Sequence, residues 1–276
     1  RELILKNWKL QIGLVLVLLP GLGTAVTAFM EAETLQYQAY YQGVFSAGEP
    51  IGIADIQWQT RLMDFDEGAG AAIETHLQVS SAAHGFVEEL YPFRLQYRSL
   101  AMQKPMRTIA YERYDSTDND GWELTWLDTG SRSALRFRQG NEQQPGVKAQ
   151  LPTALVSWGS QRGEYRFYKP ARHPAVPRML DRVALLQKVR GNNLTVGERF
   201  EITVTDGKRQ YLYQVSVLGA EQLTIGTKTW DALKIKFDGY RTKRGVTGRA
   251  HEPVEVWLAD TPERTPLRFE HQSAIG

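Results

Sequence analysis

The sequence predicts a mainly β protein: a single domain built on a curved antiparallel sheet or open barrel, with one amphipathic helix. Apolar and polar residues alternate along most of the chain after residue 30, which is typical of strands with one covered and one wetted face. Turn residues separate these runs, as they do in successive hairpins. Only one long stretch, near residue 180, has clear helical periodicity instead.

The first strand shows the alternation most simply. One face is expected to carry four apolar or aromatic residues: Leu35, Tyr37, Ala39 and Tyr41. The same pattern recurs at residues 51–58 and 73–79. Because side chains of a strand point alternately to its two faces, each segment presents one apolar face to a common core.

Three hairpin turns are predicted from Gly-containing dipeptides. Asn119–Gly121, Asp206–Gly207 and Asp238–Gly239 each follow a strand-like run. Asp-Gly and Asn-Gly suit the left-handed backbone positions of tight hairpin turns. We therefore expect the chain to reverse direction at all three places.

The middle of the chain has a different character. Residues 139–177 contain five prolines and little periodicity, apart from a possible strand at Glu164–Tyr168, and predict an extended surface excursion. A helix is expected over 178–190, where one face is apolar and Gly191 follows the last turn. A short helical stretch is also expected near His84–Leu90.

The N-terminal residues 1–28 are typical of an export signal. Arg1, Lys6 and Lys9 precede the apolar run Ile12–Leu19, and Val26–Ala28 supplies small residues for a cleavage site. The alternative is an uncleaved N-terminal anchor in the inner membrane. Either reading predicts a periplasmic domain over 33–276, with no transmembrane span in the mature body because no second hydrophobic run follows.

Charge and cysteine content exclude several classes of protein. Without residues 1–28, basic and acidic side chains are equal in number, whereas a nucleic-acid-binding surface needs an excess of Lys and Arg. We therefore expect no nucleic-acid partner. The absence of cysteine excludes disulfides, thiol nucleophiles and Cys-based metal sites.

No catalytic or metal-binding motif is present, so we expect no enzyme and no cofactor. The histidines are scattered, and His251–Glu255 lacks the second His of a zinc helix motif. Ser157 and Ser160 lack the Gly-x-Ser-x-Gly elbow of a serine hydrolase. A hydrolase of glycan or cell wall would need two carboxylates converging in a cleft.

Aromatic residues on the predicted strands are the candidate ligand-binding residues. The set consists of Trp58, Trp122, Trp126, Tyr211 and Tyr213. They would line a concave apolar pocket for a lipid or similar molecule. The alternative is that they form ordinary sheet core, since aromatic residues favour strands in any case.

The order of motifs in the C-terminal third resembles the DUF3108 family of bacterial envelope proteins, whose function is unknown. The matching segments are Leu180–Arg190, Val196–Phe200, the Asp206–Gly207 hairpin, Ile225–Leu233, Val256–Asp260 and Pro266–Phe269. The resemblance extends over most of 35–271 and is poorest in the proline-rich segment. It implies a periplasmic, β-rich fold and transfers no catalytic residues.

These observations lead to one expected function and two alternatives. We expect a non-enzymatic envelope protein that binds a hydrophobic molecule such as a lipid in its curved sheet. The first alternative is a structural or assembly factor that acts through contacts with envelope proteins, recognised by an exposed apolar patch or an open strand edge. The second alternative is the glycan or wall hydrolase.

Overall fold

The computed structural model confirms a mainly β, antiparallel fold with few helices. It describes residues 14–18, 32–43, 46, 49–65, 70–117, 121–128, 130–139, 155, 158, 165–167, 173–176, 178–243 and 246–271. The predicted turn at Asn119–Gly121 lies mostly outside these residues, but the strands that it joins pair as expected.

The strands form two halves that we name by their order in the chain. The first half contains β2 (Ala32–Tyr41), β3 (Ile51–Asp64), β4 (Ala71–Ser80), β5 (Arg94–Gln103), β6 (Met106–Asp115), β7 (Gly121–Asp128), β8 (Ser133–Gln139), β9 (Tyr165–Phe167) and β10 (His173–Pro174). The second half contains β11 (Arg199–Thr205), β12 (Gln210–Ile225), β13 (Lys228–Lys243), β14 (Val246–Arg249), β15 (Val254–Ala259) and β16 (Pro266–His271).

A short strand, β1 (Leu14–Leu18), pairs with both β2 and β16 and so joins the halves into one sheet. It lies inside the predicted export signal, whose other residues are outside the described part of the chain. Whether that signal is cleaved therefore stays a prediction. The strands at the two ends of the order, β10 and β11, do not pair with each other, so the sheet is open.

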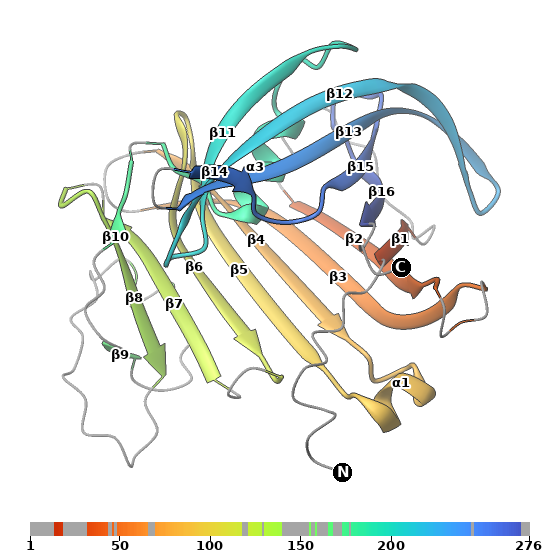
Figure 1. The fold of residues 1–276 in the computed structure, drawn as a ribbon, viewed down its shortest axis with the longest axis horizontal. Helices are drawn as coiled ribbons and strands as arrows, with labels where there is room; N and C mark the ends of the chain where they lie inside the picture. Colours follow the sequence, from red (N-terminus) through yellow and green to blue (C-terminus); the bar gives the residue numbers. More distant parts are fainter. Residues whose placement is uncertain are drawn as a thin grey trace.

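The second half arches over the first, and helix α3 (Arg182–Arg190) lies between them (Figure 1). We call the sheet face towards α3 the inner face. Asp181 caps the helix: its Oδ1 accepts hydrogen bonds from the backbone N–H groups of Val183 (2.8 Å) and Ala184 (3.0 Å). Its Oδ2 accepts from Ser99 and Thr108 of β5 and β6, which ties the start of the helix to the first half.

The inner core fills the space between the halves. It combines residues of the first half, α3 and the second half, among them Tyr37, Trp58, Leu186, Val189, Ile235 and Leu258. The apolar residues of α3 are therefore mostly buried between the two halves of the sheet, and the helix fills the concave side of the sheet.

A second core lies on the outer face of the first half. Leu100, Leu124 and Phe137 are buried there together with Leu155 and Trp158. The last two residues belong to the segment predicted as a surface excursion, so that prediction was wrong for these positions. Their large apolar side chains cover an outer face that carries its own apolar stripe.

Other sequence predictions divide into confirmed and wrong ones. The Asp206–Gly207 turn is confirmed, with Gly207 at a φ of 78°, and the short helix near residue 84 is α1 (Gly85–Leu90).

The predicted turn at Asp238–Gly239 was wrong, because β13 continues through these residues to Lys243. The ring of Tyr213 lies directly against Gly239, where a Cβ atom would be 3.2 Å from it.

Candidate functional site

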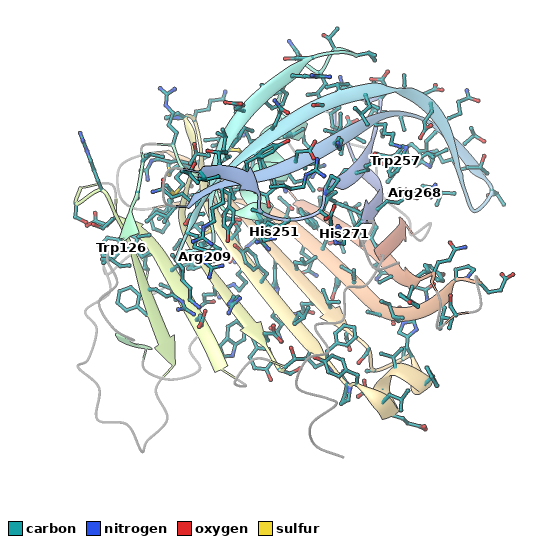
Figure 2. All side chains as sticks on the ribbon, in the orientation of Figure 1. Trp126, Arg209, His251, Trp257, Arg268 and His271 are labelled. Carbon is teal, nitrogen blue, oxygen red and sulfur yellow. The ribbon has the colours of Figure 1, made fainter. Side chains whose placement is uncertain are left out.

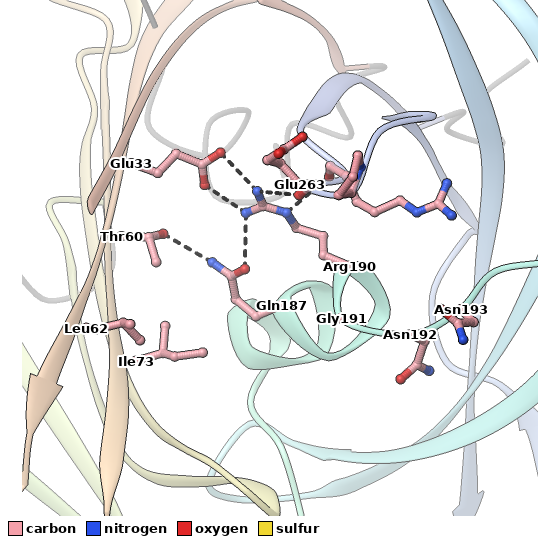
Figure 3. Close-up of a pocket in the computed structure, with 12 residues that line it drawn as sticks. Glu33, Thr60, Leu62, Ile73, Gln187, Arg190, Gly191, Asn192, Asn193 and Glu263 are labelled. Carbon is pink, nitrogen blue, oxygen red and sulfur yellow. Dashed lines mark hydrogen bonds and ion pairs between the residues drawn. The ribbon is translucent and has the colours of Figure 1, made fainter. Parts of the chain in front are cut away.

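A cleft of about 370 Å³ opens at the C-terminal end of α3 (Figure 3). It lies between the start of β2, the end of β3, the start of β4 and the turn that joins β15 to β16. The lining residues are Glu33, Thr60, Leu62, Ile73, Gln187, Arg190, Gly191, Asn192, Asn193, Pro262, Glu263 and Arg264. The cleft therefore forms where both halves of the sheet meet the helix.

Arg190 organises the cleft, and all of its N–H groups have acceptors. Its Nη1 and Nη2 donate to the two carboxylate oxygens of Glu33 at 2.8 and 2.9 Å. The remaining donors reach the side-chain oxygen of Gln187 (3.1 Å) and the backbone carbonyls of Glu263 (3.0 Å) and Arg264 (3.1 Å). Each of the five N–H donors of Arg190 therefore has its own acceptor. We call Arg190 and Glu33 the inner ion pair; its role is structural, because it holds β2, α3 and the β15–β16 turn together.

Gln187 completes this polar network one helical turn earlier. Its side-chain amide donates to Thr60 Oγ1 at 3.1 Å and to Thr75 Oγ1 at 3.3 Å, while its oxygen accepts from Arg190. Glu33 and Arg190 are both buried and form an ion pair with each other. Because their charges are opposite, the pair adds no net charge to the wall of the cleft.

The rest of the cleft combines an apolar wall with hydrogen-bonding groups. Leu62, Ile73 and Pro262 supply the apolar surface, and Asn192 and Asn193 supply amides at the rim. The end of a helix also presents backbone carbonyls and a partial negative charge. Such a site suits an uncharged or weakly cationic donor group attached to an apolar body.

The five aromatic residues predicted to bind a ligand do not meet at one site. Trp58 lies in the inner core, and its indole N–H donates to Thr60 Oγ1. Trp126 packs against the outer core. Trp122 is four residues earlier on β7 and so lies on the same face of the strand, with its ring centre 5.5 Å from that of Tyr114. Figure 2 shows Trp126 on the first half, far from Trp257 on the second.

The two tyrosines lie in the second half. Tyr213 packs against the inner core, and Tyr211 donates a hydrogen bond to Asp206 at 2.7 Å. Tyr211 also lines a second cleft, of about 450 Å³, beside Arg209 and Arg241. The aromatic residues thus contribute to two cores and one polar cleft, and their role in ligand binding stays a prediction.

Two buried carboxylates, Glu74 and Glu112, share one arginine. With Arg98 and Trp158 they form what we call the outer cluster. Arg98 donates to Glu74 (2.7 Å) and to Glu112 (2.9 Å), so it separates the two carboxylates. Trp158 donates its indole N–H to Glu74 at 2.9 Å, and the Arg98 guanidinium lies over the Trp158 ring. The cluster attaches Trp158 to the sheet.

The pKa of Glu74 reflects this arrangement. Burial alone would raise it, but hydrogen bonds from Arg98 and Arg61 outweigh burial and lower the pKa below its ordinary value. Glu74 is therefore held as a carboxylate. No group of three or more potential metal ligands occurs among the described residues, and no helix in that part of the chain is long and apolar enough to cross a bilayer.

The match to a family model extends over residues 36–276, under the description "Protein of unknown function (DUF3108)". The chain belongs to the DUF3108 family. This confirms the resemblance drawn from the motifs of the C-terminal third, while the family's own function is unknown. No curated protein and no solved structure matches this DUF3108 protein.

The residues that build the cleft were not singled out from the sequence. Arg190 was expected only at the end of a helix, and Glu33 only at the start of the domain. The two are 157 positions apart, and no local pattern connects them. An arginine in the last turn of the predicted amphipathic helix is the signal that was available.

Proposed function

We propose that this DUF3108 protein is a non-enzymatic binding protein that holds a small amphipathic molecule, such as a lipid fragment, in the cleft at the end of α3. Export to the periplasm is part of the proposal and is supported by residues 1–28. The observation that carries the proposal is that α3 and the inner core occupy the concavity of the sheet, while the cleft remains open beside them.

The character of the cleft supports this ligand class. Its volume of about 370 Å³ falls within the range of small-molecule sites. Leu62 and Ile73 would contact an apolar body, and Asn192 and Asn193 would contact a polar head group. Because the donors of Arg190 are all used, an anionic head group would have to displace Glu33, which makes a neutral head group the better fit.

Native mass spectrometry of the full chain purified from periplasm tests the proposal. We expect a bound small molecule that is lost when Ile73→Trp fills the cleft. The matched control is Leu212→Trp, which enlarges a lining residue of the second cleft and should leave the ligand bound. A wild-type protein without any bound molecule, or equal loss in both variants, would contradict the proposal.

The second candidate is assembly through protein contacts, and the edge strand β11 favours it. Leu180 pairs with β11 only at Thr203 and Thr205. The N–H and C=O groups of Arg199 and Glu201 point to the same side, because alternate residues share an edge. No other described segment pairs with them. Such an open edge is a site for strand addition.

The charges on this edge favour a second copy of the chain as the added strand. In an antiparallel pair centred on Phe200, Arg199 of each copy lies opposite Glu201 of the other. Shifting the register by one pair of residues in either direction places like charges opposite each other, which is unfavourable. The same mass spectra would then show two chains, and Glu201→Arg would reduce that species.

A further inference from the structure

An apolar tip projects from one end of the first half, at α1 and its flanking residues. Phe86 and Leu90 are each 69% exposed, and Tyr91 is 40% exposed. Phe86 and Leu90 are four positions apart and so lie on one helix face. No residue of α1 is buried. Glu89 is the one charged residue among the exposed members of this segment: Ala82, Ala83, Gly85, Phe86, Glu89, Leu90, Tyr91 and Pro92.

An ion pair and one core contact attach the tip to the rest of the sheet. The carboxylate of Glu88 accepts hydrogen bonds from Ser81 (2.6 Å) and from both terminal nitrogens of Arg94 (2.7 and 3.0 Å). Val87 packs against the inner core. The hydrogen bonds from Arg94 and Ser81 lower the pKa of Glu88 to about 2, so this ion pair persists at neutral pH. The exposed apolar side chains are therefore presented outward by the fold.

The position of the tip indicates what covers it. α1 follows β4 at the end of the sheet where β2 ends and β3 begins (Figure 1). Leu14, the first residue of β1, pairs with Tyr41, the last residue of β2. Leu14, the first residue that the structure describes, therefore lies at the same end of the sheet as the tip. Residues 1–13 combine six aliphatic or aromatic residues with Arg1, Lys6 and Lys9, a composition that favours a membrane surface.

We propose that this end of the protein rests on a lipid bilayer, with Phe86, Leu90 and Tyr91 inserted at its interface. A protruding apolar helix with aromatic residues suits the boundary between head groups and acyl chains. The cleft lies at the other end of the same strands, since Glu33 and Tyr41 are at opposite ends of β2. Eight residues of extended chain separate them by about 26 Å, so the cleft lies far from the end that contacts the bilayer.

The test uses the full chain, which has no cysteine, so a single introduced cysteine can be labelled cleanly. Leu90→Cys carries an environment-sensitive nitrobenzoxadiazole dye and is mixed with phosphatidylcholine vesicles containing brominated acyl chains. The matched control is Val246→Cys on β14, which is 72% exposed in the second half. We expect a blue shift and quenching by bromine at position 90 and neither at position 246.

A second variant shows whether the apolar side chains are responsible. Phe86→Ser combined with the label at position 90 should weaken vesicle partitioning of the tip by about tenfold, the scale expected for one lost aromatic contact. Equal signals at positions 90 and 246, or an unchanged signal after Phe86→Ser, would overturn the proposal. A blue shift that depends on protein concentration and not on vesicles would also overturn it, because it would identify a protein contact. None of these readouts depends on the cleft, so failure here leaves the proposed ligand site untouched.

Discussion

The inner ion pair and the outer cluster are each centred on one arginine, yet they connect different parts of the chain. Arg190 joins β2, α3 and the β15–β16 turn, and so links both halves of the sheet. Arg98 joins neighbouring strands of the first half to Trp158. The first arrangement holds the fold closed around its cleft, whereas the second attaches a covering segment to one face.

The two arginines also differ in exposure, and Arg190 is the more deeply buried. The Arg190 side chain is 7% exposed and its partner Glu33 is 3% exposed. Arg98 is 18% exposed and has two carboxylates in place of one. Because a charge that loses its partner costs more when it is buried more deeply, disruption of the inner ion pair should affect stability more strongly and over a wider region.

The largest effect is expected for Arg190→Ala. This change leaves Glu33 buried without a cation and three segments without their common donor, so we expect the free energy of unfolding to fall by about 3–5 kcal/mol. Urea denaturation of the full chain measures it. Lys188→Ala, at an exposed position of the same helix turn, should stay within about 0.5 kcal/mol of wild type.

The double variant Glu33→Gln/Arg190→Met sharpens this comparison, because it removes both charges together. It should be more stable than Arg190→Ala, since no uncompensated charge remains. If Arg190→Ala and Lys188→Ala were equally stable, the inner ion pair would not be holding the halves together.

A smaller effect is expected for Trp158→Phe in the outer cluster. The variant keeps an aromatic ring over Arg98 but loses the indole N–H that donates to Glu74. Glu74 keeps Arg61 and Arg98 as partners, so the loss should be about 1–2 kcal/mol. Limited proteolysis should detect faster cleavage around residue 158, while the protection of α3 stays as in wild type. Equal loosening of α3 would show that the two regions are not independent.

Local sequence patterns predicted the strands well because their period of two is read directly from neighbouring residues. The start of α3 was predicted too early, at residue 178. The helix begins after its capping residue Asp181, whose side chain is held by hydrogen bonds from Ser99 and Thr108, more than 70 positions away.

Two Asp-Gly pairs also had different outcomes, because contacts with residues outside the pair differ between them. Gly207 forms a turn, whereas Gly239 lies in a strand under the Tyr213 ring.

The candidate site was less predictable than the fold because its walls come from separate segments. Aromatic residues indicated a pocket, but the sheet has an inner and an outer core, and Trp58 and Trp126 belong to different ones. Sequence periodicity gives the face of a strand on which a residue lies, but not which of two cores that face meets. The cleft required knowledge of how the β15–β16 turn approaches α3.

Acidification provides the smallest perturbation of the outer cluster, through Glu74 and through His76, which lies near Arg98, Glu74 and Glu112. Burial and the nearby Arg98 lower the pKa of His76 below 6.5, and the pKa of Glu74 lies below 4.5. For both groups the folded state binds protons less readily than the unfolded state, so the stability that they contribute is present at neutral pH and is lost as pH falls. We expect the urea midpoint to decline first below about pH 6.5, through His76 and His251, and again below about pH 4.5, through Glu74 and the other carboxylates with lowered pKa values, Glu88 and Asp206. His76→Gln should reduce the first decline, leaving the part that comes from His251, whose pKa is also lowered by burial and by Arg182. It should leave the second decline unchanged, because Glu74 keeps its arginine partners. If the urea midpoint of His76→Gln declined in parallel with that of wild type between pH 7 and 5, the first decline would come from another part of the molecule.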